Sequence, residues 1–309
     1  MADEAYYRAE VRERVWLTPH MVRLRLGAPP VRKPGASDVA AGGLPDLTRF
    51  VSTGVGDERL VLVLPGPGED EPPLPVPTET GWDYPDPASR PVMRSYTVRS
   101  FDPDAGELAV DVVAHEGGVA SDWARSARVG DRLLVTEARG WYDPPVDAEW
   151  QLLLGDLTAL PAIGRLAESI RSGLHTMAVV EVVGPADRQP LPAGVRTRWL
   201  CGSGNGLGPS RLLQALHEVD WPAGPGYVWF AGEAADSRAV RRHLRHDLGW
   251  PAARYDVLGY WRAGQAEWTR RYEQLAPGLE QVYTDAVRRG LSSTEALEVY
   301  DDALERVGL

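Results

Sequence analysis

Arginine, aromatic and hydroxyl side chains occur close together in the stretch MRSYTVRSF, residues 93–101. In a β-strand, Arg94 and Tyr96 lie on one face, whereas Ser95 and Thr97 lie on the other. An arginine beside a flat ring can hold a phosphate and stack an aromatic ligand, and the Thr97 hydroxyl can hydrogen-bond a ring nitrogen of such a ligand. An exposed strand with solvated arginines is the alternative interpretation.

A glycine-rich turn leads into a predicted short helix in AHEGGVASDWARSARVGD, residues 114–131. The free N–H groups at the start of such a helix attract anions, so a pyrophosphate would fit at residues 117–121. Ser121 is equally suited to be an ordinary helix cap. No metal-ligand spacing surrounds His115, and we predict no metal site.

The carboxyl ends of later strands provide a third candidate region. In LLLGDLTALPAIG, residues 152–164, a predicted strand ends at Gly155, and Asp156 or Thr158 can cap the helix that follows. FAGEAADS, residues 230–237, repeats this pattern on a later strand. Open α/β sheets bind their ligands at this edge, so both segments are candidates for a nucleotide site.

Two further segments give weaker signals. GYWRAG, residues 259–264, offers Trp261 to cover an aromatic ring and Arg262 to bind an anion, although a buried aromatic beside a surface arginine is the alternative. GSGNGLG, residues 202–208, is rich in glycine. Because no G-x-G-x-x-G follows the first strand of this half, the glycines alone are weak evidence for a nucleotide site.

The composition is typical of a soluble globular protein. The 309 residues are 25% charged, and the net charge of −11 argues against a nucleic-acid partner. The single cysteine, Cys201, excludes an internal disulfide and fits a reducing cytoplasm. The sequence has no apolar run long enough to span a membrane and no signal-peptide pattern, so we expect a cytoplasmic protein without membrane association.

The hydrophobic pattern changes near the middle of the chain. Short strands predicted in the first half lie at residues 21–26, 59–65, 94–100, 107–115 and 131–138, with long loops at 28–49 and 65–92. From residue 150 onward strands alternate with helices, including helices near 209–219 and at 236–249. We therefore predict a β plus α/β fold with three parts: an antiparallel Greek-key β-barrel (1–148), a parallel α/β domain (149–265) and a helical C-terminal extension (266–309), in which Ser293 or Thr294 caps the last helix.

Six stretches, in the same order, resemble the siderophore-interacting proteins, which are flavin-dependent ferric-siderophore reductases of the ferredoxin-reductase-like superfamily. The stretches are RPVMRSYTVRSFD, VDVVAHEGGVASDWARSARVGD, LLLGDLTALPAI, VEVVGPADRQPL, VWFAGEAADSRAVRRHL and GYWRAG. The resemblance extends over residues 5–265 or so. Its order and number of motifs make it highly specific.

The resemblance implies a set of site residues. FAD-binding residues would be Arg94, Ser95, Tyr96, Thr97, Val112, Val113, His115, Gly118, Ala120, Ser121 and Trp123. Residues at the nicotinamide and flavin side would be Asp156, Thr158, Ala159, Gly232, Glu233, Tyr260 and Trp261, and Arg262 is the candidate for the anionic siderophore. No side chain is assigned as catalytic, because the flavin carries the chemistry.

By this resemblance the chain is a monomeric enzyme that passes electrons from NADPH or NADH through FAD to a ferric siderophore and releases Fe(II). Ferredoxin is an alternative donor, because some relatives with extra C-terminal helices are associated with it. The sequence departs from the family pattern at Val119, Leu157 and Cys201, and its single lysine is Lys33. A flavin oxidoreductase acting on another small substrate in a biosynthetic pathway and a non-catalytic flavin- or siderophore-binding protein are the alternatives.

Overall fold

The computed structural model describes residues 6–30, 43–78, 81–84, 86, 90–291 and 293–307. Lys33 and parts of both predicted long loops lie outside the described residues. The chain forms two compact units: one comprises residues 1–142, 160–171 and 183–193, and the other comprises 143–159, 172–182 and 194–309. The domain boundaries placed after residues 148 and 265 stay a prediction.

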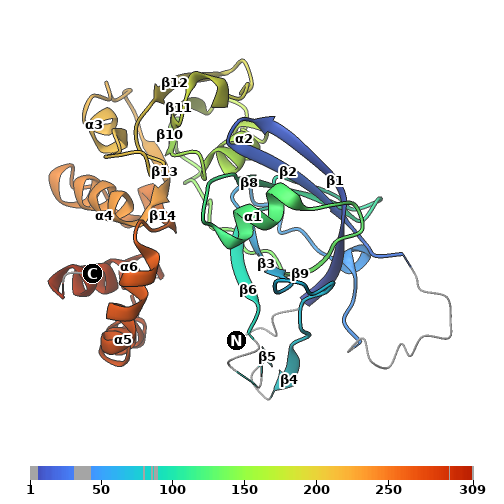
Figure 1. Ribbon diagram of the computed structural model, residues 1–309. Helices are drawn as coiled ribbons and strands as arrows, with labels where there is room; N and C mark the ends of the chain where they lie inside the picture. Colours follow the sequence, from blue (N-terminus) through green and yellow to red (C-terminus); the bar gives the residue numbers. More distant parts are fainter. Residues whose placement is uncertain are drawn as a thin grey trace. The chain divides into compact units, whose positions relative to one another are not determined.

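The first unit contains a seven-stranded antiparallel sheet. Its strands are β1 (Tyr6–Thr18), β2 (Met21–Gly27), β3 (Arg59–Leu64), β6 (Val92–Thr97), β7 (Ser100–Asp102), β8 (Glu107–Val113) and β9 (Arg132–Thr136), in the order β6-β3-β9-β1-β2-β8-β7 (Figure 1). The pairing of strands distant in the sequence confirms the Greek-key type of fold, and β6 also contacts β8 across the curled sheet. In β2, Val22, Leu24 and Leu26 are fully buried, as their alternation predicts.

The strand predicted at residues 94–100 is interrupted. Strand β6 pairs with β3 up to Thr97, whereas the Arg99 N–H bonds the carbonyl of Ala109 in β8, so the chain changes partner between them. Val98, at this crossover, is fully buried in the core of the barrel. Its neighbour Thr97 is buried as well, so strict alternation of buried and exposed side chains ends at Thr97, whereas Tyr96 packs against the same barrel core as Val98.

The predicted loop at 65–92 also contains structure. Strands β4 (Val76–Thr78) and β5 (Gly81–Asp83) form a small antiparallel sheet within it. A 3-10 turn, η2 (Leu47–Arg49), lies in the loop predicted at 28–49, and its Leu47 is buried in the barrel core. A single buried apolar side chain in a polar segment gives no periodic signal, which explains why the sequence indicated only loops.

The second unit contains a five-stranded parallel sheet. Its strands are β10 (Trp150–Gly155), β11 (His175–Val182), β12 (Val195–Cys201), β13 (Gly226–Glu233) and β14 (Tyr255–Trp261), in the order β12-β11-β10-β13-β14. Helices α3 (Leu212–His217) and α4 (Ala234–Arg242) pack on one side of this sheet through Leu216 and Val240. Helix α3 is shorter than predicted, and α4 continues as a π-helical turn, η5 (His243–Asp247).

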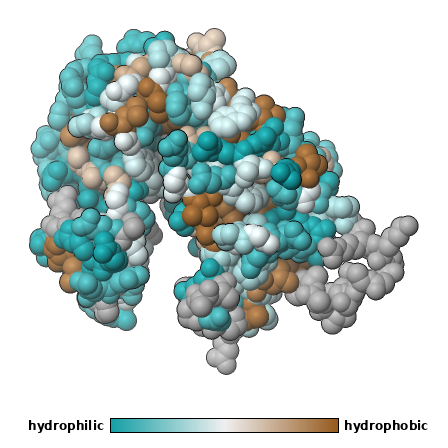
Figure 2. All heavy atoms as spheres, in the orientation of Figure 1, coloured by the Kyte–Doolittle hydropathy of each residue, from teal (hydrophilic) through white to brown (hydrophobic). Residues whose placement is uncertain are grey.

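The C-terminal extension is helical, as predicted. Helices α5 (Gln265–Arg288) and α6 (Ser293–Arg306) pack on each other through Leu279, Ala303 and Leu304. No helix in the described part of the chain combines the length and apolar character needed to cross a lipid bilayer. Figure 2 shows hydrophilic residues over much of the visible surface, in keeping with the high net charge.

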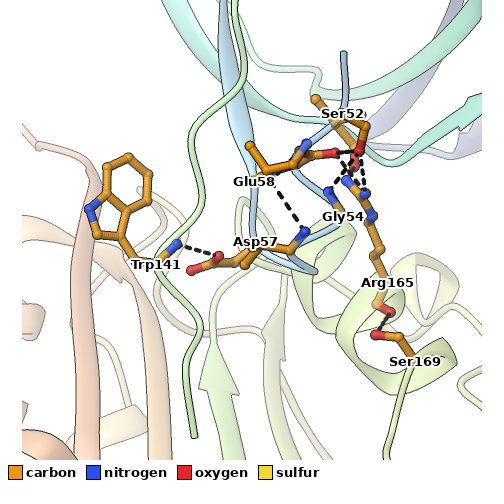
Figure 3. A network of polar contacts seen from close by, with 10 residues as sticks. Ser52, Gly54, Asp57, Glu58, Trp141, Arg165 and Ser169 are labelled. Atoms are coloured by element: carbon orange, nitrogen blue, oxygen red, sulfur yellow. Dashed lines mark hydrogen bonds and ion pairs between the residues drawn. The ribbon is translucent and has the colours of Figure 1, made fainter. Parts of the chain in front are cut away.

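One helix from the second half of the sequence belongs to the barrel unit. Helix α2 (Leu160–Glu168) carries Arg165, which lies 2.7 Å from Glu58 Oε1 (Figure 3). Arg165 also donates to the Val98 carbonyl at 2.6 Å. Glu58 is fully buried and also accepts from the Ser52 hydroxyl and from Thr53. The cost of burying this carboxylate is thus offset by a cation and three hydrogen bonds.

Arg165→Met is expected to destabilise the protein by about 3–5 kcal/mol, because it leaves the buried Glu58 carboxylate without its cation. Urea unfolding measures this loss. Arg198→Met is the control, because Arg198 pairs with Glu218 at the surface and a smaller loss is expected there. Equal losses in the two variants would contradict the role given to the buried pair.

The pH dependence provides an independent check. Burial tends to raise the pKa of Glu58, but the hydrogen bonds from Ser52 and Thr53 and the Arg165 charge outweigh it, and the pKa lies below the ordinary 4.5. The resulting stabilisation is present above pH 4.5 and is lost as the pH falls through the lower folded-state value. Glu58→Gln is therefore expected to reduce the loss of unfolding free energy that the wild-type protein shows as the pH falls below 4.5.

Candidate functional site

The exposed part of β6 forms the first candidate site. Arg94 is exposed and donates to the Met93 carbonyl at 2.8 Å; its other N–H groups bond no further residue in the described part of the chain. Tyr96 is half-buried, and burial raises its pKa to about 12, so the phenol stays protonated and can donate a hydrogen bond. Ser95 is exposed, whereas Thr97 is only 5% exposed.

The N-terminus of helix α1 (Val119–Ser126) provides an anion-binding element next to this strand. Helix α1 contacts both β6 and β8, and its first turn is preceded by Gly118, which supplies no capping side chain. A Cβ at Gly118 would lie 2.3 Å from the His115 ring, so glycine allows this close turn. The first N–H groups of α1 are thus left for an anion.

Ser121 has a structural role within the same turn. Its hydroxyl accepts from the His115 N–H at 2.8 Å and donates to the His115 carbonyl at 2.7 Å. The hydroxyl therefore holds the strand-to-helix turn, and the backbone rather than this side chain is free for a ligand. Trp123 is partly buried against the barrel core, and Ala120 is 7% exposed.

These residues fit FAD. Arg94 can pair with a phosphate, Tyr96 offers a flat ring, and the start of α1 offers backbone donors within the same compact unit. Val112 points into the barrel core and can contribute only its backbone, whereas Val113 is half-buried. Arg99 is not part of this group, because it forms an ion pair with Glu168 of α2.

The second candidate site lies at the carboxyl edge of the parallel sheet. Asp156 follows β10 and is 2% exposed. Its Oδ1 accepts from the N–H and the hydroxyl of Thr158, and its Oδ2 accepts from the Trp261 indole N–H at 2.5 Å. Burial raises the pKa of Asp156 in spite of these hydrogen bonds. The backbone carbonyl of Asp156 accepts from the Ala159 N–H.

Residues from β13 and β14 meet Asp156 at this edge. A Cβ at Gly232 would lie 3.1 Å from Asp156 Oδ2, so a larger residue would crowd the carboxylate. Glu233 caps α4 through the N–H groups of Ala235 and Asp236, and its other oxygen accepts from the Ala263 N–H. Tyr260 packs edge-on against Trp229. The structure thus brings together most of the predicted residues of the nicotinamide side.

Arg262 follows Trp261 directly and lies near enough to Glu233 for that charge to act on its guanidinium. Its guanidinium stands 4.0 Å above the ring of Trp268 in α5, and Trp268 in turn stacks on Tyr272. Desolvation lowers the pKa of Arg262, and the Arg238 charge adds to this effect. The proposed siderophore-binding arginine is therefore engaged by the C-terminal helices.

Sequence reasoning missed four polar residues at the carboxyl edge. Glu181 is fully buried near the end of β11 and bonds Ser203, while Asn205 accepts from the Leu157 N–H at 2.9 Å. Burial, together with the carboxylates of Glu233, Glu181 and Asp156, raises the pKa of Asp236 to about 6. One signal was available: Glu181 is the single charged residue in the apolar run MAVVEVVG.

Two family models match the chain. One described as the siderophore-interacting FAD-binding domain matches residues 10–142, and one described as siderophore-interacting protein matches residues 148–264. A curated relative from Vibrio cholerae, the ferric vibriobactin reductase ViuB, is 30% identical over 187 residues, which cover 59% of this chain and 68% of the relative. An uncharacterized protein of Mycobacterium tuberculosis is 35% identical over 196 residues, covering 58% and 68%.

Solved structures of siderophore proteins are also similar to this chain. A siderophore utilization protein from T. fusca is 32% identical with a TM-score of 0.71, and the match covers 85% of this chain and 95% of that one. The siderophore-interacting protein SipS from Aeromonas hydrophila is 28% identical with a TM-score of 0.65, covering 84% and 99%. A ferredoxin reductase of carbazole 1,9a-dioxygenase, 15% identical with a TM-score of 0.55 and covering 84% and 70%, shares the fold.

Asp236→Asn is expected to stabilise the protein at pH 8 by roughly 1–2 kcal/mol. The raised pKa means that the fold favours the protonated acid, so its contribution is full below pH 3.8 and is lost as the pH rises through about 6. Urea unfolding at pH 4 and pH 8 tests this, with the exposed Asp143→Asn as control. A variant without any gain at pH 8 would show that Asp236 is not strained by its neighbours.

Proposed function

Because the chain belongs to the siderophore-interacting protein family, we propose that it is a flavin-dependent ferric-siderophore reductase. Electrons from NAD(P)H reach Fe(III) in a siderophore through FAD, and Fe(II) is released. The observation that carries this proposal is the pairing of an exposed arginine and a flat tyrosine on β6 with the uncapped start of α1. This pairing suits a ligand with both phosphates and an aromatic ring.

The residues of the chain have binding and positioning roles in this reaction. Arg94 and the first N–H groups of α1 would hold the phosphates of FAD, and Tyr96 would offer its ring to the aromatic part. When bound, the flavin supplies a carrier that accepts a hydride and releases electrons singly. Asp156 holds the Trp261 indole in place through one hydrogen bond, so this ring is fixed at the donor side of the parallel sheet.

The iron is the substrate in this proposal. Fe(III) is held tightly by the hard oxygen ligands of a siderophore, whereas Fe(II) is held weakly, so one electron is enough to release it. The protein then needs no iron ligand of its own. We further propose that the enzyme acts as a monomer in the cytoplasm, where a nicotinamide donor is available, with ferredoxin as the alternative donor.

The purified protein is expected to be yellow and to bleach anaerobically with a nicotinamide donor. A ferric tris-catecholate or tris-hydroxamate complex should then restore the colour while a ferrous chelator traps Fe(II). Bleaching without reoxidation by either iron complex would point to a flavin oxidoreductase with another substrate. A colourless protein that takes up no FAD would overturn the proposal.

Arg94→Ala is expected to weaken FAD binding about 10- to 100-fold, because a charge-assisted hydrogen bond to a phosphate is lost. Tyr96→Ala should also weaken it through the lost ring contact. FAD fluorescence on titration of the apoprotein measures both effects. Arg25→Ala is the matched control, because Arg25 is an exposed barrel arginine paired with Glu13. Unchanged affinity in both test variants would remove β6 from the flavin site.

A further inference from the structure

Two histidine side chains and one carboxylate converge where the end of α3 meets the π-helical turn η5. His217 is the last residue of α3, and His243 and Asp247 are the first and last residues of η5. Each of the three offers one ligand atom, and these atoms all lie within 4.8 Å of one another. In the part of the chain that the structure describes, no other group of three His, Cys, Asp or Glu side chains converges in this way.

The contacts within this group show that the side chains face one another. His243 Nδ1 lies 2.8 Å from Asp247 Oδ2, and the rings of His217 and His243 meet edge to face with their centroids 4.2 Å apart. The side chain of His243 is only 12% exposed, whereas that of Asp247 is 64% exposed, and His217 is exposed as well. One ligand is therefore nearly fixed, and two ligands are accessible from solvent and free to adjust.

Buried neighbours hold the backbone of both histidines. Leu216 precedes His217 and Leu244 follows His243, and these two leucines are fully buried in the same apolar core. The Leu248 N–H donates to the His243 carbonyl at 3.1 Å and closes the π-helical turn. Such turns are rare and are frequent at functional sites. An ion at this point would need only side-chain rotations, because the two elements that carry its ligands are already packed together.

Two imidazole nitrogens and one carboxylate oxygen suit a divalent transition-metal ion better than Mg²⁺ or Ca²⁺. The hard ions prefer sets of oxygen ligands, whereas imidazole is a good ligand for zinc, copper, iron and nickel. Tetrahedral Zn²⁺ has bonds of about 2.0–2.2 Å to nitrogen and oxygen, which places its ligand atoms about 3.3–3.5 Å apart. The exposed His217 and Asp247 can reach this spacing by rotation, and three protein ligands leave a fourth position for water.

We propose that His217, His243 and Asp247 form a binding site for a divalent transition-metal ion such as Zn²⁺. The ion joins the end of α3 to η5, so its binding stabilises the packing of these elements. The ligands belong to the second unit, and the site is independent of the flavin and of the proposed reductase activity. The sequence predicted no metal site, because His217 is far from His243 along the chain and only the packing of α3 against α4 brings the two together.

Calorimetric titration with Zn²⁺ of the flavin-loaded protein, freed of metal and without a histidine tag, tests the site. One ion per chain is expected to bind with a Kd of about 1–10 μM, more weakly than at a closed site of four ligands. Excess Mg²⁺ should not displace the ion, because it does not compete for imidazole. Absence of saturable binding, or displacement of Zn²⁺ by Mg²⁺, would overturn the proposal.

Variants identify the ligands. His217→Gln, His243→Gln and Asp247→Asn are each expected to weaken Zn²⁺ binding at least about 10-fold. His246→Gln is the matched control, because His246 is an exposed histidine of the same turn and is not one of the three converging residues. Unchanged affinity in His217→Gln, or an equal loss in His246→Gln, would overturn the assignment.

Thermal unfolding separates metal coordination from folding. His243 is half-buried and its replacement can disturb the turn, whereas the exposed His217→Gln variant keeps the contact between His243 and Asp247. Saturating Zn²⁺ is expected to raise the unfolding midpoint of the wild-type protein by about 2–4 °C and to leave that of His217→Gln unchanged. An equal rise in both proteins, or no rise in the wild type, would contradict the link between α3 and η5.

Discussion

The buried ion pair between Glu58 and Arg165 is the interaction on which the organisation of the barrel unit depends. The two residues are far apart in the sequence, and the Glu58 carboxylate is fully buried where they meet. Arg165 also donates to the Val98 carbonyl, at the crossover between β6 and β7. The pair belongs wholly to the barrel unit, since helix α2 is part of that unit although β10, directly before it in the sequence, belongs to the parallel sheet.

The buried carboxylates of the parallel sheet have other partners than the buried carboxylate of the barrel unit. Glu58 is paired with a cation, whereas Asp156 is satisfied by neutral donors, and Glu181 keeps one oxygen without a donor among the described residues. The first environment stabilises the fold and the second orients an indole ring, whereas the third leaves a buried oxygen beneath the backbone of Gly204. Burial alone does not define a functional carboxylate; the identity of its partners does.

Much of the fold could be predicted from the sequence. The alternation in β2 and the switch to helical periodicity after Trp150 are local signals, and the structure confirms both. The crossover at Val98 and the pairing of Arg99 with Glu168 could not be predicted, because both depend on contacts with elements distant in the sequence. For the candidate sites, the motifs around Tyr96 and Asp156 identified the neighbourhoods. The packing of the glycine loop on Glu181 could not be predicted, because it depends on the backbone conformation at Gly204.

The contact between Arg262 and Trp268 couples the C-terminal helices to the region that matches the family. The family match ends at residue 264, and α5 begins at Gln265. The first aromatic ring of the extension therefore covers a cation that belongs to the family core, and desolvation already shifts its pKa. Removing the extension would therefore change the environment of a residue that lies within the family match. Substitutions at Arg262 and at Trp268 are accordingly expected to have non-additive effects on stability.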